Sequence, residues 1–367
     1  MTNAILRGKP DAGNPHVRFD EGEVASAKPR RGSLLYKKLK PLPLVGPITY
    51  YLPIRNGRPC REGLTGEWRL ITQAEIRVVR GEFAGMDRFY AAIPKDGRNF
   101  LTAAGIALFG AVGSNDSVLF DAVLKDIAAF PARYGSPEAG LAVEIVMSWV
   151  RQFLRASPEC PPWLENLDLS LLPGEWRRQA AYLAVSCLIR KGERKAAAVL
   201  ADALLNLDAE RSVQSSAADI YLKMAKATIC RDEGRLDESE RWCREVVASA
   251  KPLGIVLPFL GIMMGPKSPM ERALAAGAPE LLAKVKKLTN GYFRNLVRFH
   301  NLFTGEKVTE ALTPREFYLA QCLKEGLRYK EVAARLGVSV ANVHNLVVVV
   351  YEKLHIRSNR ALSGKVW

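Results

Sequence analysis

Apolar residues near the C-terminus recur at the three- and four-residue spacing of amphipathic helices, in short segments that are separated by glycines. Thr313 and Pro314 suit the cap and first position of the first segment, and Glu316 stands where a capping box needs a carboxylate. Gly326 ends this segment. Its apolar positions are Phe317, Leu319, Ala320 and Leu323.

Two further helices are predicted directly after the first. One covers residues 329–336, and the turn 337–339 then leads into a helix that Ser339 can cap and that reaches about Leu354. The inner face predicted for this last helix is Val340, Val343, Val347, Val350 and Leu354. Two short helices around a glycine-bearing turn, braced by another helix, predict a helix-turn-helix.

The chain ahead of this motif is helical throughout residues 63–300, which predicts an all-α protein. The tetrapeptide Gly-Glu-Trp-Arg at 66–69 recurs at 174–177, and the helix after each copy closes on a glycine, at Gly81 and Gly192. A third helix ends at Gly234, and a further helix follows each of these glycines. Gly192 and Gly234 are 42 residues apart. A helix, a glycine turn and a second helix at such a period are typical of tetratricopeptide-like (TPR-like) pairs.

The C-terminal stretch resembles the LuxR-type helix-turn-helix. Leu-Thr-Pro-Arg-Glu stands at 312–316, and Glu-Gly and Lys-Glu-Val-Ala follow within 325–333. Leu-Gly-Val-Ser at 336–339, Lys-Leu at 353–354 and Ile-Arg-Ser at 356–358 continue the family pattern in register. Matches over about fifty residues are far more specific than a bare helix-turn-helix pattern.

The resemblance implies that the third helix of the motif enters the DNA major groove. There Asn345 can pair with an adenine edge, His344 can donate to a guanine or a phosphate, and Val348 can contact a thymine methyl. Lysine and arginine residues of the motif stand where family members contact phosphates. The predicted DNA-binding residues are Lys330, Ser339, Ala341, Asn342, His344, Asn345, Val348, Lys353 and Arg357. The alternative interpretation is that these are ordinary exposed residues of a solvated surface.

The sequence departs from the family pattern at several positions. Leu346 replaces a usual histidine, Val348 and Val349 replace polar residues, and Ala341 replaces a frequent arginine. The closing helix, which forms the dimer contact in the family, is predicted over residues 358–367 and is short. These departures predict weak, partner-dependent or altered DNA recognition, and an apolar patch that can dock a protein or a second copy.

Three regions are therefore predicted: a basic, proline-rich arm at 1–60, a TPR-like sensor or docking region at 61–300 and the DNA-binding domain at 308–367. The middle region resembles the helical-repeat segment of the large maltose-activator-type LuxR regulators, without their ATPase domain. The resemblance implies that it receives a small effector, a protein or a second subunit.

Composition narrows the functional classes. The formal net charge is +15, which favours nucleic acid as a partner, although the arm alone holds eleven Lys and Arg against four Asp and Glu. The apolar runs fall short of the roughly 20 residues of a membrane span. The six cysteines have no metal-ligand spacing and predict reduced thiols in a bacterial cytoplasm.

No catalytic, cofactor or metal site is predicted. Residues 261–268 superficially resemble a phosphate-binding loop, but their spacing is wrong and Pro266 removes a backbone donor. The four histidines form no metal-ligand set. The sequence thus favours a transcriptional regulator that binds double-stranded DNA, with a possible homodimer. The alternative is a helical-repeat interaction scaffold whose degenerate helix-turn-helix no longer reads sequence.

Overall fold

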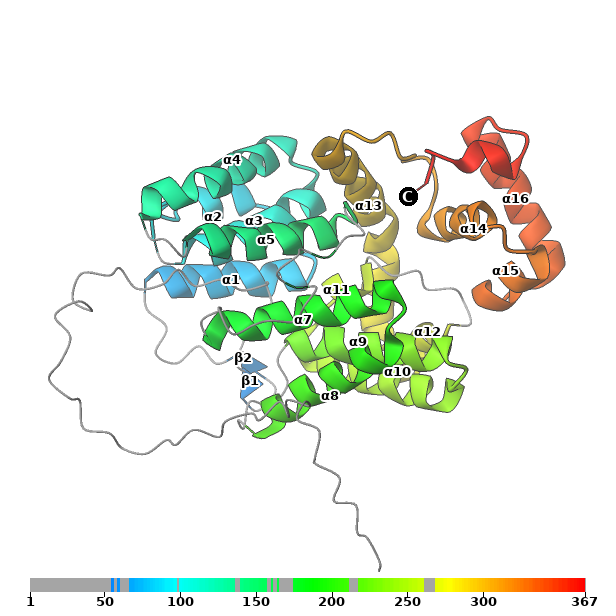
Figure 1. Cartoon of the computed structure of the whole chain (residues 1–367), viewed down its shortest axis with the longest axis horizontal. Coiled ribbons are helices and arrows are strands. Elements are labelled where there is room, and N and C mark those ends of the chain that lie inside the picture. The colour runs from blue at the N-terminus through cyan, green and yellow to red at the C-terminus, as the bar shows by residue number, and fades with distance from the viewer. Residues whose placement is uncertain are drawn as a thin grey trace, which may run out of the picture. The chain divides into compact units, whose positions relative to one another are not determined.

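A computed structural model shows that the protein is all-α, as predicted (Figure 1). It describes residues 54–55, 58–59, 66–97, 99–135, 139–156, 160, 164, 174–210, 217–260 and 268–366. The strands among these residues are β1 (Ile54–Arg55) and β2 (Arg58–Pro59), which have two residues each and pair in antiparallel fashion.

A first group of helices packs around α3 (Phe100–Ser114), whose residues are apolar on nearly every side and mostly buried. A helix that is apolar on every side has to be buried on every side. Accordingly, α3 contacts all the other helices of this group, which are named below, and also the later helix α13. Phe100 stacks on Phe130 with ring centroids 5.2 Å apart. The other members of the group are α1 (Glu67–Val79), α2 (Met86–Ala91), α4 (Ser117–Tyr134) and α5 (Ala139–Phe153).

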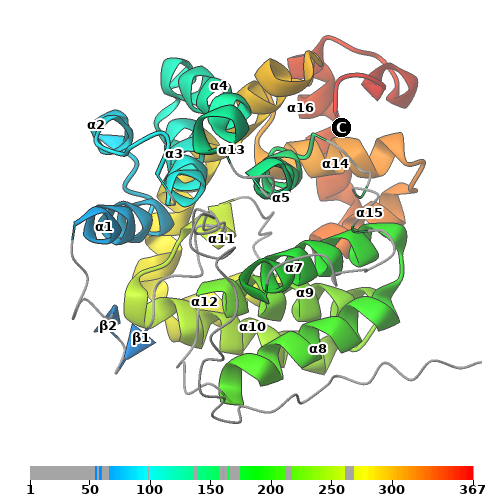
Figure 2. The same ribbon diagram turned by 60° about the vertical axis from the view of Figure 1, so that its left-hand side comes forward.

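Two helix pairs follow at the positions where the glycine turns were predicted. Their helices are α7 (Gly174–Lys191), α8 (Arg194–Glu210), α9 (Ala217–Asp232) and α10 (Leu236–Ala250) (Figure 2). Gly192 and Gly234 make the turns with φ of 80° and 77°. A small residue allows close approach within the second pair, because buried Ser239 donates to the carbonyl of Ala227 over 2.8 Å. Their likeness to TPR repeats stays a prediction.

The segment after Gly81 differs from the predicted repeat, because no full helix follows this glycine directly. Phe83 instead enters the core and stacks on Tyr292 of α13, with centroids 5.6 Å apart, before the short helix α2 begins. Gly81 itself lies against Leu288 and Val256, and a Cβ at this position would come within 2.6 and 2.9 Å of their side-chain methyl groups, which would have to shift. Contacts with the distant helix α13 therefore override the local pattern here.

The long helix α13 takes part in two hydrophobic cores. It is reached through η1 (Lys251–Leu253), α11 (Leu257–Leu260) and α12 (Pro269–Gly277), and it runs over Pro279–Thr304. Leu296 and Phe299 belong to the core of the preceding helices, whereas Phe293 and Val297 belong to the core of the C-terminal helices.

The C-terminal helices are α14 (Pro314–Lys324), α15 (Tyr329–Leu336) and α16 (Val340–Leu354), which confirms the predicted helix-turn-helix. The predicted closing helix at 358–367 is wrong. A four-residue 3-10 helix, η2 (Asn359–Leu362), ends before Gly364, which has a φ of 73°, and Ser363 then bridges to Val366. Leu362 and Val366 complete the core of the same domain, so this segment folds back on its own helices.

The prediction that all cysteines are reduced is wrong for one pair. Cys160 and Cys187 form a disulfide, with Cα atoms 5.9 Å apart, although 27 residues separate them in sequence. No spacing motif signals a pairing that depends on how α7 packs. Cys230, Cys243 and Cys322 are free and buried.

Some predicted features cannot be compared with the structure. The basic arm lies almost entirely outside the described residues, and so do residues 261–267, which superficially resemble a phosphate-binding loop in sequence. Among the helices that the structure describes, none is by itself long and apolar enough to cross a membrane. α15 and α16 meet that test as a pair, and the pair is bent by 99°.

Two glycine substitutions separate backbone strain from crowding. We expect Gly81→Ala to lower the free energy of unfolding by about 2–4 kcal/mol, because a Cβ would lie 2.6 Å from Leu288 and the φ of 75° is also unfavourable for alanine. Gly192→Ala is the matched control, since it shares the positive φ and has open space around it. It should cost about 1–2 kcal/mol. Equal losses in urea unfolding would contradict the packing at Gly81.

Candidate nucleic-acid interface

The capping box at the start of α14 also anchors the end of α16. The Thr313 hydroxyl accepts from the backbone N–H of Glu316, and the Glu316 carboxylate accepts from the backbone N–H of Thr313 over 2.8 Å. The ammonium of Lys353 donates to both oxygens of the same carboxylate, at 2.8 and 2.7 Å. A single, mostly buried carboxylate thus joins the first and last helices of the motif.

These contacts hold Glu316 in its charged form. Burial by itself raises the pKa of the carboxyl, but the hydrogen bonds from Lys353 and Thr313 outweigh burial and leave the pKa below its ordinary value. Lys353 was predicted to contact phosphate, and the structure places its ammonium in this ion pair instead of leaving it without a partner.

The turn between α15 and α16 has both of its expected caps. Gly337 ends α15 with a φ of 65°, and the Ser339 hydroxyl accepts from the backbone N–H of Asn342 to begin α16. At the start of α15, the guanidinium of Arg328 has no acceptor atom to offer as a cap. Only the carboxylate half of a capping box is therefore present here: the carboxylate of Glu331 accepts from the backbone N–H of Arg328 over 2.7 Å.

The faces of α16 are sharply divided. Val343, Val347, Val350 and Leu354 are buried in the core of the domain, as predicted. Val340 was predicted to lie on the same face and is 41% exposed, because as the first residue of the helix it projects beyond that core. The opposite face is open to solvent, and its exposed predicted residues are Ala341, Asn342, His344, Asn345 and Val348.

The exposed face of α16 combines polar and apolar groups. The imidazole of His344 packs edge-on against the ring of Tyr329 in α15, with centroids 4.6 Å apart, so its position is fixed by the preceding helix. Val348 is 55% exposed and Val349 is 36% exposed. Tyr329 was not among the predicted site residues; it is half-buried against the core of the domain at the start of α15.

The predicted cations have different surroundings. Lys330 at the start of α15 and Arg357 after α16 are both exposed, and neither forms an ion pair with another described residue. Nearby, the Tyr351 hydroxyl donates to the side-chain oxygen of Asn359, which holds η2 against α16. Two of the three predicted phosphate contacts thus remain available to a ligand.

Comparison with known proteins decides what kind of domain this is. Residues 310–363 match the family model described as bacterial regulatory proteins, luxR family. The C-terminal domain is a LuxR-type helix-turn-helix domain. The match leaves the preceding helices unassigned. No curated protein and no solved structure matches the chain.

The LuxR-type domain is tied closely to α13. The side chain of Asn301 donates to the carbonyl of Val308 over 2.8 Å and accepts from its N–H over 2.9 Å, so the connecting segment lies against the last turns of α13. Arg298 forms an ion pair with Glu310 at 3.2 Å. The rings of Phe293 and Phe317 meet edge-on, with centroids 5.3 Å apart. Hydrogen bonds, an ion pair and an aromatic contact thus join the domain to α13.

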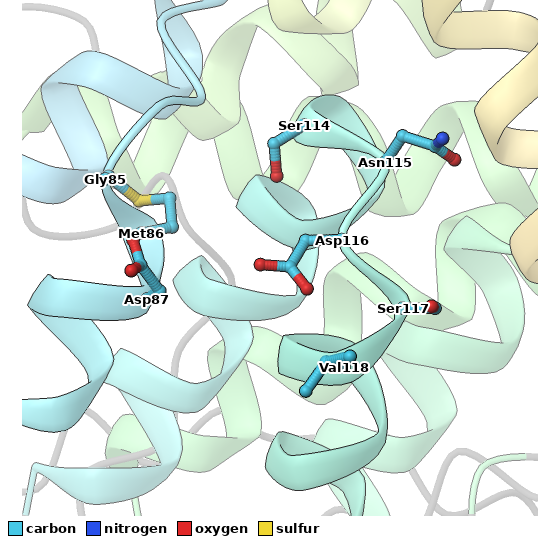
Figure 3. A pocket seen from close by; sticks show the side chains of 8 residues that line it. All are labelled: Gly85, Met86, Asp87, Ser114, Asn115, Asp116, Ser117 and Val118. Atoms are coloured by element: carbon cyan, nitrogen blue, oxygen red, sulfur yellow. The ribbon is translucent and has the colours of Figure 1, made fainter.

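The helical region has a hollow of about 440 Å³ where α2 and α4 begin (Figure 3). Asp87 in the first turn of α2 and Asp116 just before α4 lie beside it, and Asp116 caps α4 by accepting from the backbone N–H of Leu119 over 2.9 Å. Elsewhere in this region, neither carboxyl oxygen of buried Glu75 has a hydrogen-bond partner among the described residues, nor has the hydroxyl of Thr72 one turn earlier. Burial raises the pKa of the Glu75 carboxyl well above its ordinary value.

The contact between Glu316 and Lys353 predicts a pH dependence. The folded-state pKa of Glu316 is depressed, so its stabilisation is fully present above the pKa of the unfolded chain, about 4.3, and is lost as pH falls through the lower folded value. We expect Glu316→Gln to cost about 1–3 kcal/mol near neutral pH and less in acid. Glu352→Gln, at an exposed neighbour of Lys353, is the control. Equal effects of both variants in unfolding titrations from pH 7 to 3 would refute this role.

Proposed function

We propose that the protein is a transcriptional regulator that binds double-stranded DNA through α16. The observation that supports this most is the outer face of α16, which is open to solvent along its length while its inner face is buried against the other helices of a LuxR-type domain. A helix held in this way can lie in a major groove without rearrangement of the core.

The exposed groups fit different parts of a duplex. Asn345 pairs with a base edge through its amide, and His344, fixed by Tyr329, donates to a base or a phosphate. Asn342 and Ala341 border the groove at the start of the helix. Lys330 and Arg357 contact phosphates, which sets register and affinity without selecting sequence. Ser339 acts through its cap, and Lys353 acts chiefly through Glu316.

Control from the helical region would pass through α13. A small effector, a protein or a second subunit that binds these helices and prefers one arrangement of α13 would also select an arrangement of the LuxR-type domain. The hollow beside Asp87 and Asp116 offers polar groups that such a ligand would satisfy. We propose that this regulation occurs in a bacterial cytoplasm, with a homodimer as one route to it.

A second candidate is an interaction scaffold that uses the exposed valines of α16 for docking. The two functions are separated by selecting bound duplexes from a random library with the full-length protein, across a salt titration. A regulator should enrich a sequence motif with a salt-sensitive affinity. Charge-driven binding without a motif would remove base recognition from Asn345 and His344. A complete lack of binding would favour the scaffold.

Substitution of Asn345 tests base recognition. We expect Asn345→Ala to weaken binding to the enriched duplex by roughly fivefold to 150-fold, because a bidentate pair with a base is lost. Binding to unrelated duplexes should change little. Asn290→Ala, at an exposed asparagine of α13, is the matched control and should bind like the parent protein in the same fluorescence-anisotropy titration. Identical affinities for the two variants would exclude Asn345 from base recognition.

Substitution of Lys330 tests phosphate contact. Lys330→Ala should weaken binding about equally for all duplexes and reduce the slope of log K against log salt by roughly 0.9, which corresponds to one counterion. Lys287→Ala removes an exposed lysine of α13 and should leave the slope unchanged. An unchanged slope for Lys330→Ala would place its ammonium away from the backbone.

A further inference from the structure

The exposed face of α16 has an unusual chemistry for a helix that lies in a major groove. No Lys or Arg occurs from Val340 to Glu352. The commonest specific contact to DNA is a Lys or Arg that bridges O6 and N7 of guanine. Two neighbouring cations are also engaged elsewhere, since Lys353 pairs with Glu316 and Arg335 pairs with Glu325 at 3.7 Å. The surface therefore lacks the groups that usually select guanine.

The groups that are present match a different base pair. Asn345 and Val348 are three residues apart, so they are neighbours on one face of α16, and both are exposed. They are separated by about 4.5 Å along the helix axis, which is close to the rise of one base pair, about 3.4 Å. An Asn amide fits the N6 and N7 edge of adenine, and an apolar side chain fits the C5-methyl group of thymine.

Resting on the proposed function, we propose that α16 reads A·T base pairs, with Asn345 on an adenine edge and the methyl groups of Val348 on a thymine C5-methyl. At 55% exposure Val348 has apolar surface to remove from water, and the thymine methyl is the apolar group of the major groove. Glu352, one turn further along the same face, lies in the last turn of α16 and is farther than Val348 from the N-terminal residues that such a helix presents to the bases.

The experiment compares thymine with uracil, which pairs identically and lacks the methyl group. Two random duplex libraries are copied from one template pool, one with thymine and one with deoxyuridine, and bound fractions are selected with the full-length protein. The thymine library should yield a motif with A·T pairs at its core. Replacing one contacted thymine of that motif by deoxyuridine should weaken binding about fourfold, as expected for one buried methyl group.

Protein variants identify the reader of the methyl group. Val348→Ala should bind the thymine and uracil forms of the motif with nearly equal affinity, and its unfolding midpoint should be unchanged because the side chain is exposed. Val199→Ala, at a 71% exposed valine of α8, should retain the fourfold difference. The base substitution provides a test in which the protein is unaltered.

The outcomes separate this inference from the proposed function. Recognition of A·T pairs would be overturned by an enriched motif of G·C pairs. It would also be overturned by a motif that the protein binds equally well with thymine and with deoxyuridine. Either result would leave DNA recognition itself intact. A fourfold difference that persists in Val348→Ala would overturn the assignment to Val348. Failure to bind either library would overturn both, and would favour a protein partner for the exposed valines.

Discussion

The architecture depends on one helix that contributes side chains to two cores. α13 buries Leu296 and Phe299 among the preceding helices and Phe293 and Val297 in the LuxR-type domain. The paired hydrogen bonds between Asn301 and Val308 then keep the connecting segment on the helix. Because packed cores tolerate little deformation, a displacement of α13 would be felt on both sides of it. The helical region and the LuxR-type domain therefore share one helix in their two cores.

Charged side chains of the LuxR-type domain stabilise its fold as well as offering contacts to a ligand. The carboxylate of Glu316 caps α14 and holds Lys353, so a cation at the expected phosphate position braces α16 against α14. Lys330 and Arg357 are exposed and form no ion pair with another described residue. The exposed face of α16 has no Lys or Arg from Val340 to Glu352. We therefore attribute the proposed selection of a DNA sequence to shape, amide groups and methyl groups rather than to a guanidinium.

The sequence was sufficient to predict the elements of the C-terminal domain whose caps and turns depend on neighbouring residues. Thr313, Gly337 and Ser339 act as caps and turns, and the helices of the domain begin and end where these residues predict. Contacts between residues far apart in the chain could not be predicted from such local patterns. Phe83 enters a core built by α13, Cys160 meets Cys187, and residues after Ser358 return to the domain instead of forming a helix. The exposed face of α16 was predicted because it follows from helical spacing, whereas the pairing of Lys353 requires the folded domain.

The run of valines in α16 also has a consequence for folding. β-Branched residues lose rotamer freedom in a helix and are common in strands, so Val347 to Val350 form a helix chiefly because the domain buries half of them. The hexapeptide from Leu346 to Tyr351 has no charge and no proline, which is the composition of segments that stack into cross-β fibrils. The helical state of α16 thus conceals a strand-forming sequence, and its caps protect the chain from self-association as well as shaping a surface for DNA.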